Sequence, residues 1–302
     1  STASGSACPS AAGSSPESLV EVYPASGVRL FGGEWHSRAM TLDPHSPSLL
    51  STPTHLERLA QAAGAMTRAA RETWLGAPVP TCPGWTVLDL VAHQGMVHRW
   101  ATAAVRLDPE GMGNAASRET EGRTSADPIG WLEAGAADLI QALGQAPDDL
   151  DTLVFLKEAP RAKAFWARRQ CHETTVHALD ALGAVRGRPL TAADAWFDDD
   201  LALDGIDELL IGFWQRGKFA IRSAIPYAVL VRPDTSPVAW VVTISDGPVR
   251  SRRIDPEEQV AVDLTLSGTP VDLYLALWNR GGSPADPDGA LDRFREGGAI
   301  TW

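Results

Sequence analysis

The sequence predicts an α+β protein of two domains. An antiparallel four-helix bundle is expected over residues 51–188, and a smaller α+β domain with an antiparallel sheet over residues 189–302. Two observations support this prediction. From about residue 52 apolar side chains recur at helical spacing, and after Pro189 the chain changes to short segments rich in β-branched residues. A length of 302 residues is sufficient for two separate cores.

Residues 1–50 differ in composition from the rest of the chain. Their first part, STASGSACPSAAGSSPES, is rich in Ser, Ala and Gly and shows no helical or strand period. Such a segment buries too little apolar surface to fold, so a flexible extension is expected. It lacks the basic start and continuous apolar stretch of a secretory signal. Met40 is an alternative start of the functional unit.

The first two helices of the predicted bundle have clear apolar or capping patterns. Over residues 53–74 one stripe contains Leu56, Leu59, Ala63, Met66, Ala70 and Trp74. The second helix follows the proline-rich segment APVPTCPGW. Thr86 and Asp89 have the spacing of a capping box, in which each side chain accepts from a backbone N–H of the other residue.

The third and fourth helices complete the bundle. A polar loop over residues 108–126 precedes a third helix at 127–145. The fourth helix is expected from about residue 161 to residue 182, ended by Gly183 and Gly187. Mostly short connections favour an antiparallel arrangement of these helices.

The smaller domain is predicted to combine helices with strands. A helix over about residues 196–216 precedes three strand segments, IPYAVLVRPD, VAWVVTISDG and VAVDLTLSG, each closed by Asp or Gly. The segment VDLYLALWNRG then reads as a helix and is followed by a glycine-rich C-terminal stretch.

Composition excludes several classes of protein. A net charge of −12 argues against a nucleic-acid partner, whose binding needs clustered Lys and Arg. No run approaches the roughly 18 apolar residues that cross a membrane. Cys8, Cys82 and Cys171 are too few for a disulfide framework or a four-thiolate zinc site. A cytoplasmic protein is therefore expected, as a monomer or homodimer.

The segment CHETTVHALD, residues 171–180, nearly contains the H-E-x-x-H signature of zinc proteases. Its histidines, His172 and His177, are five residues apart, so on a helix they point about 140° away from each other. A zinc-protease site is therefore excluded. Glu173 and His177 are four apart and share a face, so they are able to bind one ion.

His93, on the apolar stripe of the predicted second helix, is a candidate for the third ligand. Together with Glu173 and His177 it gives two histidines and one carboxylate. Three protein ligands leave a coordination position for water or substrate, as in catalytic metal sites. The alternative is that His93 is an ordinary hydrogen-bonded core histidine. His98 and His172 lie off the proposed metal face, Cys171 is expected to be buried, and Cys82 is expected to be more exposed.

Two motifs resemble a known family. CPGWTVLDLVAHQGMVHRW (82–100) and RRQCHETTVHALDA (168–181) are similar to the two signatures of mycothiol-dependent maleylpyruvate isomerases. WVVTISDGPV and SGTPVDLYLALWNRG resemble the smaller domain of the same family. The resemblance covers roughly residues 52–302.

The resemblance implies a DinB-like four-helix bundle that binds a divalent metal, usually zinc, through His93, Glu173 and His177. It also implies mycothiol, a low-molecular-weight thiol, as cosubstrate and a small electrophile as substrate. A metal cation favours the nucleophilic thiolate over the thiol. In the isomerases the thiolate adds to maleylpyruvate, permits rotation and leaves, whereas related bundle proteins transfer the thiol to an electrophile.

The sequence departs from the family pattern after its second motif. Where members commonly have H-R-W-D, this chain has HALD, with Ala178 and Leu179 in place of Arg and Trp. Gln94 also stands where an apolar residue is more usual. These changes leave open a substrate other than maleylpyruvate.

Three further residues are candidates for the site. Arg280 matches a family arginine and would pair with a substrate carboxylate, or else be a surface arginine at a helix end. Asp180 would orient a metal ligand or cap its helix. Arg169 would face the pocket, bind Glu173, or lie on the helix surface.

The sequence is consistent with three functions. The first is a mycothiol-dependent isomerase or thiol S-transferase. The second is a hydrolase that uses water on the same metal. The third is a non-catalytic protein that binds a small molecule, such as a resistance or carrier protein.

Overall fold

The computed structural model describes residues 48–156, 158–216 and 219–295. Most of the expected extension over residues 1–50, including Met40, lies outside these residues. Its last three residues are described and are buried. Leu49 and Leu50 pack in the main hydrophobic core, and the backbone N–H of Leu49 donates to Asp204 Oδ1 at 2.8 Å. These residues are therefore part of the folded chain.

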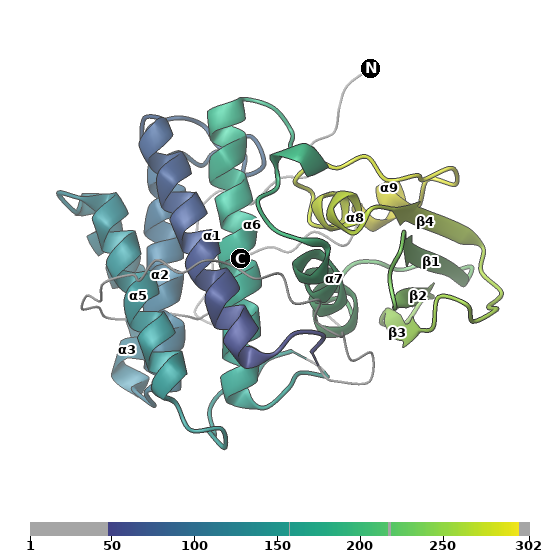
Figure 1. Ribbon diagram of the computed structural model, residues 1–302, viewed down its shortest axis with the longest axis horizontal. Coiled ribbons are helices and arrows are strands. Elements are labelled where there is room, and N and C mark those ends of the chain that lie inside the picture. Colours follow the sequence, from purple (N-terminus) through teal and green to yellow (C-terminus); the bar gives the residue numbers. More distant parts are fainter. Residues whose placement is uncertain (1–47, 157, 217–218, 296–302) are drawn as a thin grey trace.

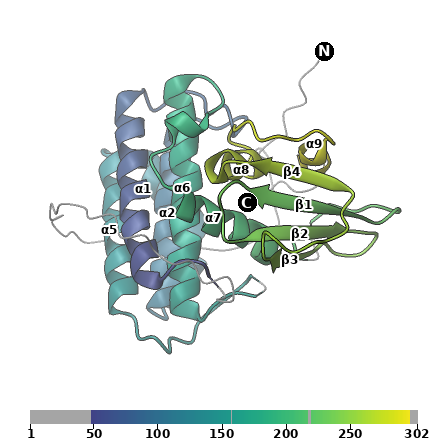
Figure 2. The same ribbon diagram turned by 45° about the vertical axis from the view of Figure 1, so that its right-hand side comes forward.

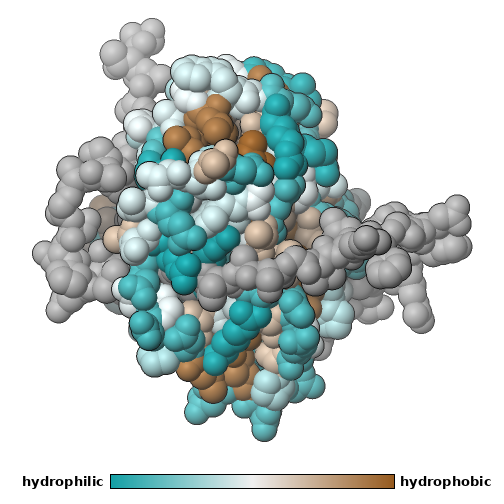
Figure 3. Space-filling model, turned by 90° about the vertical axis from the view of Figure 1, so that its left-hand side faces the viewer, coloured by the Kyte–Doolittle hydropathy of each residue, from teal (hydrophilic) through white to brown (hydrophobic). Residues whose placement is uncertain are grey.

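Four long helices lie side by side and form the bundle (Figure 1). They are α1 (Thr52–Glu72), α2 (Val87–Val105), α5 (Pro128–Gln145) and α6 (Ala162–Arg186). Trp100 and Trp166 are fully buried between them. On the side where α5 lies, the surface is largely hydrophilic, with separate smaller hydrophobic patches (Figure 3). Trp74, placed on the apolar stripe of the first helix, lies beyond its end and is 71% exposed.

Local signals set the ends of the helices that form the site. Thr86 Oγ1 accepts from the backbone N–H of Asp89, and Asp89 Oδ2 accepts from the backbone N–H of Thr86, so the predicted capping box is confirmed. Helix α6 continues through Gly183 and ends at Gly187. This glycine has φ 63°, the left-handed conformation common after a helix.

The prediction of a loop over residues 108–126 is wrong. This segment forms α3 (Pro109–Gly113) and α4 (Ala115–Thr124). Helix α4 has no apolar stripe that would mark it in the sequence. Arg123 pairs with Glu119 one turn away and with Asp89 on α2.

The second half of the chain begins with three short helical segments. They are η1 (Ala192–Asp194), α7 (Asp199–Asp207) and the π-helix η2 (Glu208–Phe213), which continues α7. The helix expected over residues 196–216 thus begins later and changes its hydrogen bonding part-way. After the strands come α8 (Pro270–Leu277), as expected, and α9 (Ala290–Arg295), which lies in the stretch interpreted only as glycine-rich.

The sheet contains β1 (Tyr227–Pro233), β2 (Ala239–Ile244), β3 (Arg250–Ile254) and β4 (Leu264–Gly268), in the order β3-β2-β1-β4. Strands β1 to β3 pair antiparallel, as expected, but β4 pairs parallel with β1, so the sheet is mixed. The chain leaves β3 and crosses to the other edge of the sheet, where β4 runs in the same direction as β1. Strand β3 was not predicted, because RSRRI has a single buried apolar residue.

Helix α7 lies between the bundle and the sheet (Figure 2). Asp207 on α7 accepts from Arg168 of α6 at 2.9 Å and from Trp240 Nε1 of β2 at 2.9 Å. Arg253 of β3 donates to the same carboxylate. Buried charged hydrogen bonds therefore connect the two halves. Of the helices in the described part of the chain, none is long and apolar enough to cross a membrane.

Candidate metal centre

Three buried side chains from two helices converge inside the bundle. His93 lies on α2, two turns after its capped start, and Glu173 and His177 lie one turn apart on α6. Each side chain offers one ligand atom, and these atoms all lie within 4.8 Å of one another. Glu173 Oε1 is 3.3 Å from His177 Nε2 and 4.0 Å from His93 Nε2.

The tautomer of His177 is set by Asp180. Nδ1 of His177 donates to Asp180 Oδ2 at 2.9 Å, so Nε2 faces Glu173 Oε1. When the proton of a neutral His177 is on Nδ1, lone pairs of Nε2 and Oε1 face each other. A shared proton or a metal cation makes that arrangement favourable. The chemistry of the donor set therefore fits a bound cation.

Asp180 is in turn fixed by Arg280. Arg280 Nε donates to Asp180 Oδ1 and a terminal nitrogen donates to Oδ2, each at 2.8 Å. Thr81 also donates to Asp180, and the Cys82 thiol lies 3.7 Å from it. This paired geometry leaves the guanidinium of Arg280 directed at Asp180 rather than at an open pocket.

Arg169 holds the second carboxylate oxygen of Glu173, Oε2. Arg169 donates to Glu173 Oε2 at 2.8 Å and also pairs with Glu208 at the start of the π-helix η2. All three side chains are buried. The surface position considered for Arg169 is therefore wrong, because a one-turn spacing turns this arginine towards Glu173 inside the protein.

The two histidines have opposite pKa shifts. Burial lowers the pKa of His93 to about 3, and the charge of His177 adds to this effect. Burial also acts to lower the pKa of His177, but hydrogen bonds with Asp180 and Glu173 outweigh it and raise the pKa to about 9. Burial acts to raise the pKa of Glu173, yet the hydrogen bond with His177 and the charge of Arg169 bring it below its usual value. The centre thus favours one positive charge beside Glu173.

Comparisons with known proteins agree with this architecture. Residues 52–182 match the mycothiol maleylpyruvate isomerase N-terminal domain, and residues 200–295 match the C-terminal domain of the same family. The chain belongs to the mycothiol-dependent maleylpyruvate isomerase family. No curated protein is significantly similar in sequence to it.

Two solved structures of a mycothiol-dependent maleylpyruvate isomerase share the fold of this family member. One, a histidine-to-alanine mutant, aligns over 84% of this chain and 98% of its own, with a TM-score of 0.55 and 13% sequence identity. The other aligns over 78% and 92%, with a TM-score of 0.51 and 13% identity.

A second group of possible metal ligands in the described residues has different chemistry. His55 and His172 each place Nε2 2.8 Å from Asp204 Oδ2. Arg168 Nε donates to the same oxygen at 3.0 Å. This carboxylate thus has three close nitrogen neighbours, one of them cationic, which suits a hydrogen-bonded junction of α1, α6 and α7 better than a metal site. Sequence reasoning placed His172 off the metal face, as observed, but did not identify His55 or Asp204.

The departures from the family pattern lie in packed regions. Ala178 and Leu179 are buried in two hydrophobic clusters. Gln94 is buried beside His98 at 2.9 Å and donates to Thr174 Oγ1 at 3.0 Å. Since these residues take part in packing and internal hydrogen bonds, their identities give no direct evidence of a changed substrate.

Both cysteines of the described residues are buried. Cys171 is buried, as expected, but Cys82 is also buried, beside Asp180, rather than exposed. Two residues near the centre were missed. Trp85 packs against His93 and His177, with ring centroids 5.0 and 6.4 Å away. Glu208 pairs with Arg169 across 39 residues, a separation that no local pattern reveals.

Proposed function

We propose that His93, Glu173 and His177 bind a divalent metal ion, with zinc as the expected ion. The observation that carries this proposal is the convergence of two imidazole nitrogens and one carboxylate oxygen within 4.8 Å in the buried bundle. Two histidines and one glutamate form a recurrent ligand set of catalytic zinc, in which a fourth position accepts water or substrate.

The function that best fits this site is activation of mycothiol for attack on a small electrophile. When bound, the ion would favour the thiolate, which is the nucleophilic form of a thiol. The protein supplies the environment. Asp180 keeps His177 oriented through Nδ1, and Arg169 balances the charge of buried Glu173.

Addition of a thiolate to an activated double bond, rotation and elimination would make the reaction an isomerisation that regenerates the thiol. Retention of the carbon–sulfur bond, with the proton of the thiol transferred to the adduct, would make it an S-transfer. Family membership favours isomerisation, since the solved relatives are maleylpyruvate isomerases. The electrophile of this chain is proposed only as a small molecule with such a bond.

We assign Arg280 a positioning role in this reaction. The side chain is 12% exposed, and two of its nitrogens hold Asp180, which in turn orients His177. The alternative role of binding a substrate carboxylate would require Arg280 to leave this pair.

Metal analysis together with a thiol-dependent assay tests the proposal. The purified chain is expected to contain about one divalent ion, and His93→Ala to contain less than about a tenth of that amount. His98→Gln serves as the matched control, because His98 is also buried on α2 but bonds to Gln94 and Thr174. Full occupancy in His93→Ala would exclude this ligand set.

The assay compares turnover of a panel of electrophiles with and without mycothiol. Turnover that requires both metal and mycothiol supports the proposal. Turnover by the metal-loaded protein without thiol would instead identify a hydrolase, and tight binding of an electrophile without turnover would identify a binding protein.

A further inference from the structure

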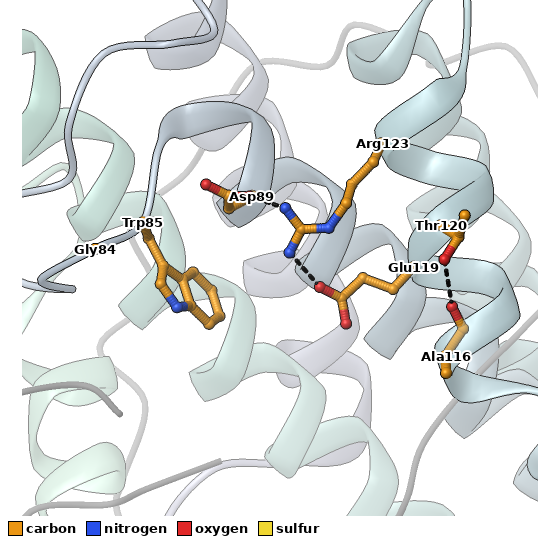
Figure 4. Close-up of a pocket in the computed structure, with 7 residues that line it drawn as sticks. All are labelled: Gly84, Trp85, Asp89, Ala116, Glu119, Thr120 and Arg123. Carbon is orange, nitrogen blue, oxygen red and sulfur yellow. Dashed lines mark hydrogen bonds and ion pairs between the residues drawn. The ribbon is translucent and has the colours of Figure 1, made fainter. Parts of the chain in front are cut away.

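A cavity of about 440 Å³ lies beside Trp85, whose ring also packs against His93 and His177 of the candidate metal centre. It is lined by the loop before α2, the first turn of α2 and one face of α4, namely by Gly84, Trp85, Asp89, Ala116, Glu119, Thr120 and Arg123. Figure 4 shows Trp85 on one side of this cavity and the α4 residues on the other.

Trp85 connects the cavity to the metal centre. Its indole lines the cavity, and the same ring lies 5.0 Å from the ring of His93 and 6.4 Å from that of His177, between centroids. The ring of His177 is nearly parallel to the indole, with an interplanar angle of 19°. A ligand with one end at the metal centre and the other in this cavity would therefore pass along Trp85.

The polar lining favours a neutral ligand with many hydroxyl groups. Arg123 lies between Asp89 and Glu119 and pairs with both (Figure 4). Two carboxylates against one guanidinium leave the lining negative, which disfavours an anion. A carboxylate accepts about four hydrogen bonds. Asp89 already accepts two from Thr86 and pairs with Arg123, so Glu119 is the main acceptor for ligand hydroxyl groups while the ion pairs remain. Thr120 adds a hydroxyl oxygen on the same face of α4.

The apolar lining suits a ring. Trp85 presents an extended flat surface, and Ala116 and Gly84 add small apolar contacts. Aromatic side chains provide large contact areas at the base of ligand pockets whose polar groups fix orientation. The C–H face of a sugar or cyclitol ring matches the indole, while its rim hydroxyls match the carboxylates.

We propose that this cavity binds the sugar–cyclitol part of the thiol cosubstrate. Mycothiol is neutral and consists of N-acetylcysteine joined to glucosamine, which is linked to inositol. Its thiol would reach the metal centre past Trp85, and its hydroxyl-rich end would contact Glu119 and Asp89. The inference rests on the proposed function. Recognition of the sugar–cyclitol end of mycothiol is thereby assigned to α4 of the bundle.

The test uses N-acetylglucosaminyl-inositol, which has the two rings but no thiol. Calorimetry with the full chain is expected to show binding that is weakened about tenfold or more by Glu119→Ala, since hydrogen bonds to a charged acceptor are lost. Glu121→Ala is the matched control, because Glu121 is on α4 but bonds to Trp131 instead. Its affinity is expected to change less than twofold.

A second variant and a second measurement guard against misfolding. Thr120→Val keeps the shape of an exposed residue and is expected to weaken binding severalfold. In the Glu119→Ala variant the KM for mycothiol is expected to rise about tenfold. The rate with N-acetylcysteine, a thiol that lacks the two rings, is expected to stay within twofold of the parent rate. Equal binding by all variants, absence of binding, or equal effects on both thiols would overturn the inference.

The two proposals fail separately. The His93→Ala variant should lose the metal but still bind N-acetylglucosaminyl-inositol. If the parent chain binds N-acetylglucosaminyl-inositol but shows no thiol-dependent turnover, the cavity assignment is supported and the proposed reaction is overturned. If the parent chain shows thiol-dependent turnover but does not bind N-acetylglucosaminyl-inositol, only the cavity assignment is overturned.

Discussion

Asp180 Oδ2 accepts a hydrogen bond from His177 Nδ1 at 2.9 Å, so the other nitrogen of the ring faces Glu173. A carboxylate in this position fixes both the tautomer and the direction of a metal-binding imidazole. Asp180 is itself held by Arg280 from the second half of the chain. For the proposed metal site, we therefore expect metal affinity to depend on the docking of that half on the bundle.

Asp180→Asn is expected to lower zinc affinity by about 10- to 100-fold, because the negative charge behind His177 is lost. Affinity can be measured by competition with a chromogenic chelator. Asp292→Asn is the control, since Asp292 is 84% exposed and far from the centre in sequence. Asp180 does not cap its helix, because α6 continues to Arg186. Unchanged zinc affinity in Asp180→Asn would therefore show that the charge of Asp180 does not support metal binding.

Arg169→Met is expected to destabilise the metal-free chain by about 3–5 kcal/mol, because Glu173 and Glu208 would be left buried without their cation. Urea unfolding measures the loss. Arg71→Met removes an arginine from an exposed pair with Glu133 and should cost less than about 1 kcal/mol. Similar losses in both variants would contradict the buried network.

The stability of the metal-free chain is expected to fall as the pH decreases from about 6.5 towards 5. Burial lowers the pKa of His98 to about 3, with Arg99 adding to the effect. In this window the unfolded chain binds a proton at His98 and the folded chain does not. This contribution is fully present above pH 6.5, and about 1.4 kcal/mol of it is lost per pH unit below.

The slope of unfolding free energy against pH tests this assignment. His98→Gln should reduce the slope by up to about 1.4 kcal/mol per pH unit. His93, whose pKa is also lowered to about 3, should contribute to the slope equally in the variant and in the parent chain. The carboxyl groups with lowered pKa, such as Glu173, titrate below the window and do not disturb it. An unchanged slope would mean that His98 becomes protonated in the folded chain.

Gly205→Ala is expected to destabilise the protein by about 1–3 kcal/mol or more. A Cβ there would lie 2.2 Å from Tyr274 Cε2 and 2.8 Å from His172 Nδ1, at the junction of α6, α7 and α8. Gly144 is an exposed position on α5 where an added Cβ would meet no atom within 4 Å, so Gly144→Ala should instead stabilise the protein by about 0.5–1 kcal/mol. Thermal unfolding of both variants checks the contrast, and a stabilised Gly205→Ala would refute it.

Local sequence patterns predicted the parts of the site that depend on helix geometry. The capping box at Thr86 sets the start of α2, and the four-residue spacing of Glu173 and His177 puts both on one face. His93 was proposed as the third ligand from its place on the apolar stripe of the second helix, and the family resemblance implied the same residue. These are relationships within one helix or one motif, which the sequence displays directly.

The features that were missed depend on contacts between distant segments. Helix α4 packs against α2, where Asp89 pairs with Arg123. Arg169 is buried because Glu208 comes to it from the other half of the chain. A single sequence shows neither pairing, so α4 resembled a polar loop and Arg169 a surface residue.

Strand β3 ends the sheet with a row of arginines. Arg250 and Arg252 are exposed on this outermost strand, whose far side has no neighbouring strand in the described sheet. Open edges invite hydrogen bonding with a strand from another molecule. A second copy approaching in that way would bring like charges together, so the edge should resist aggregation during synthesis and at high concentration.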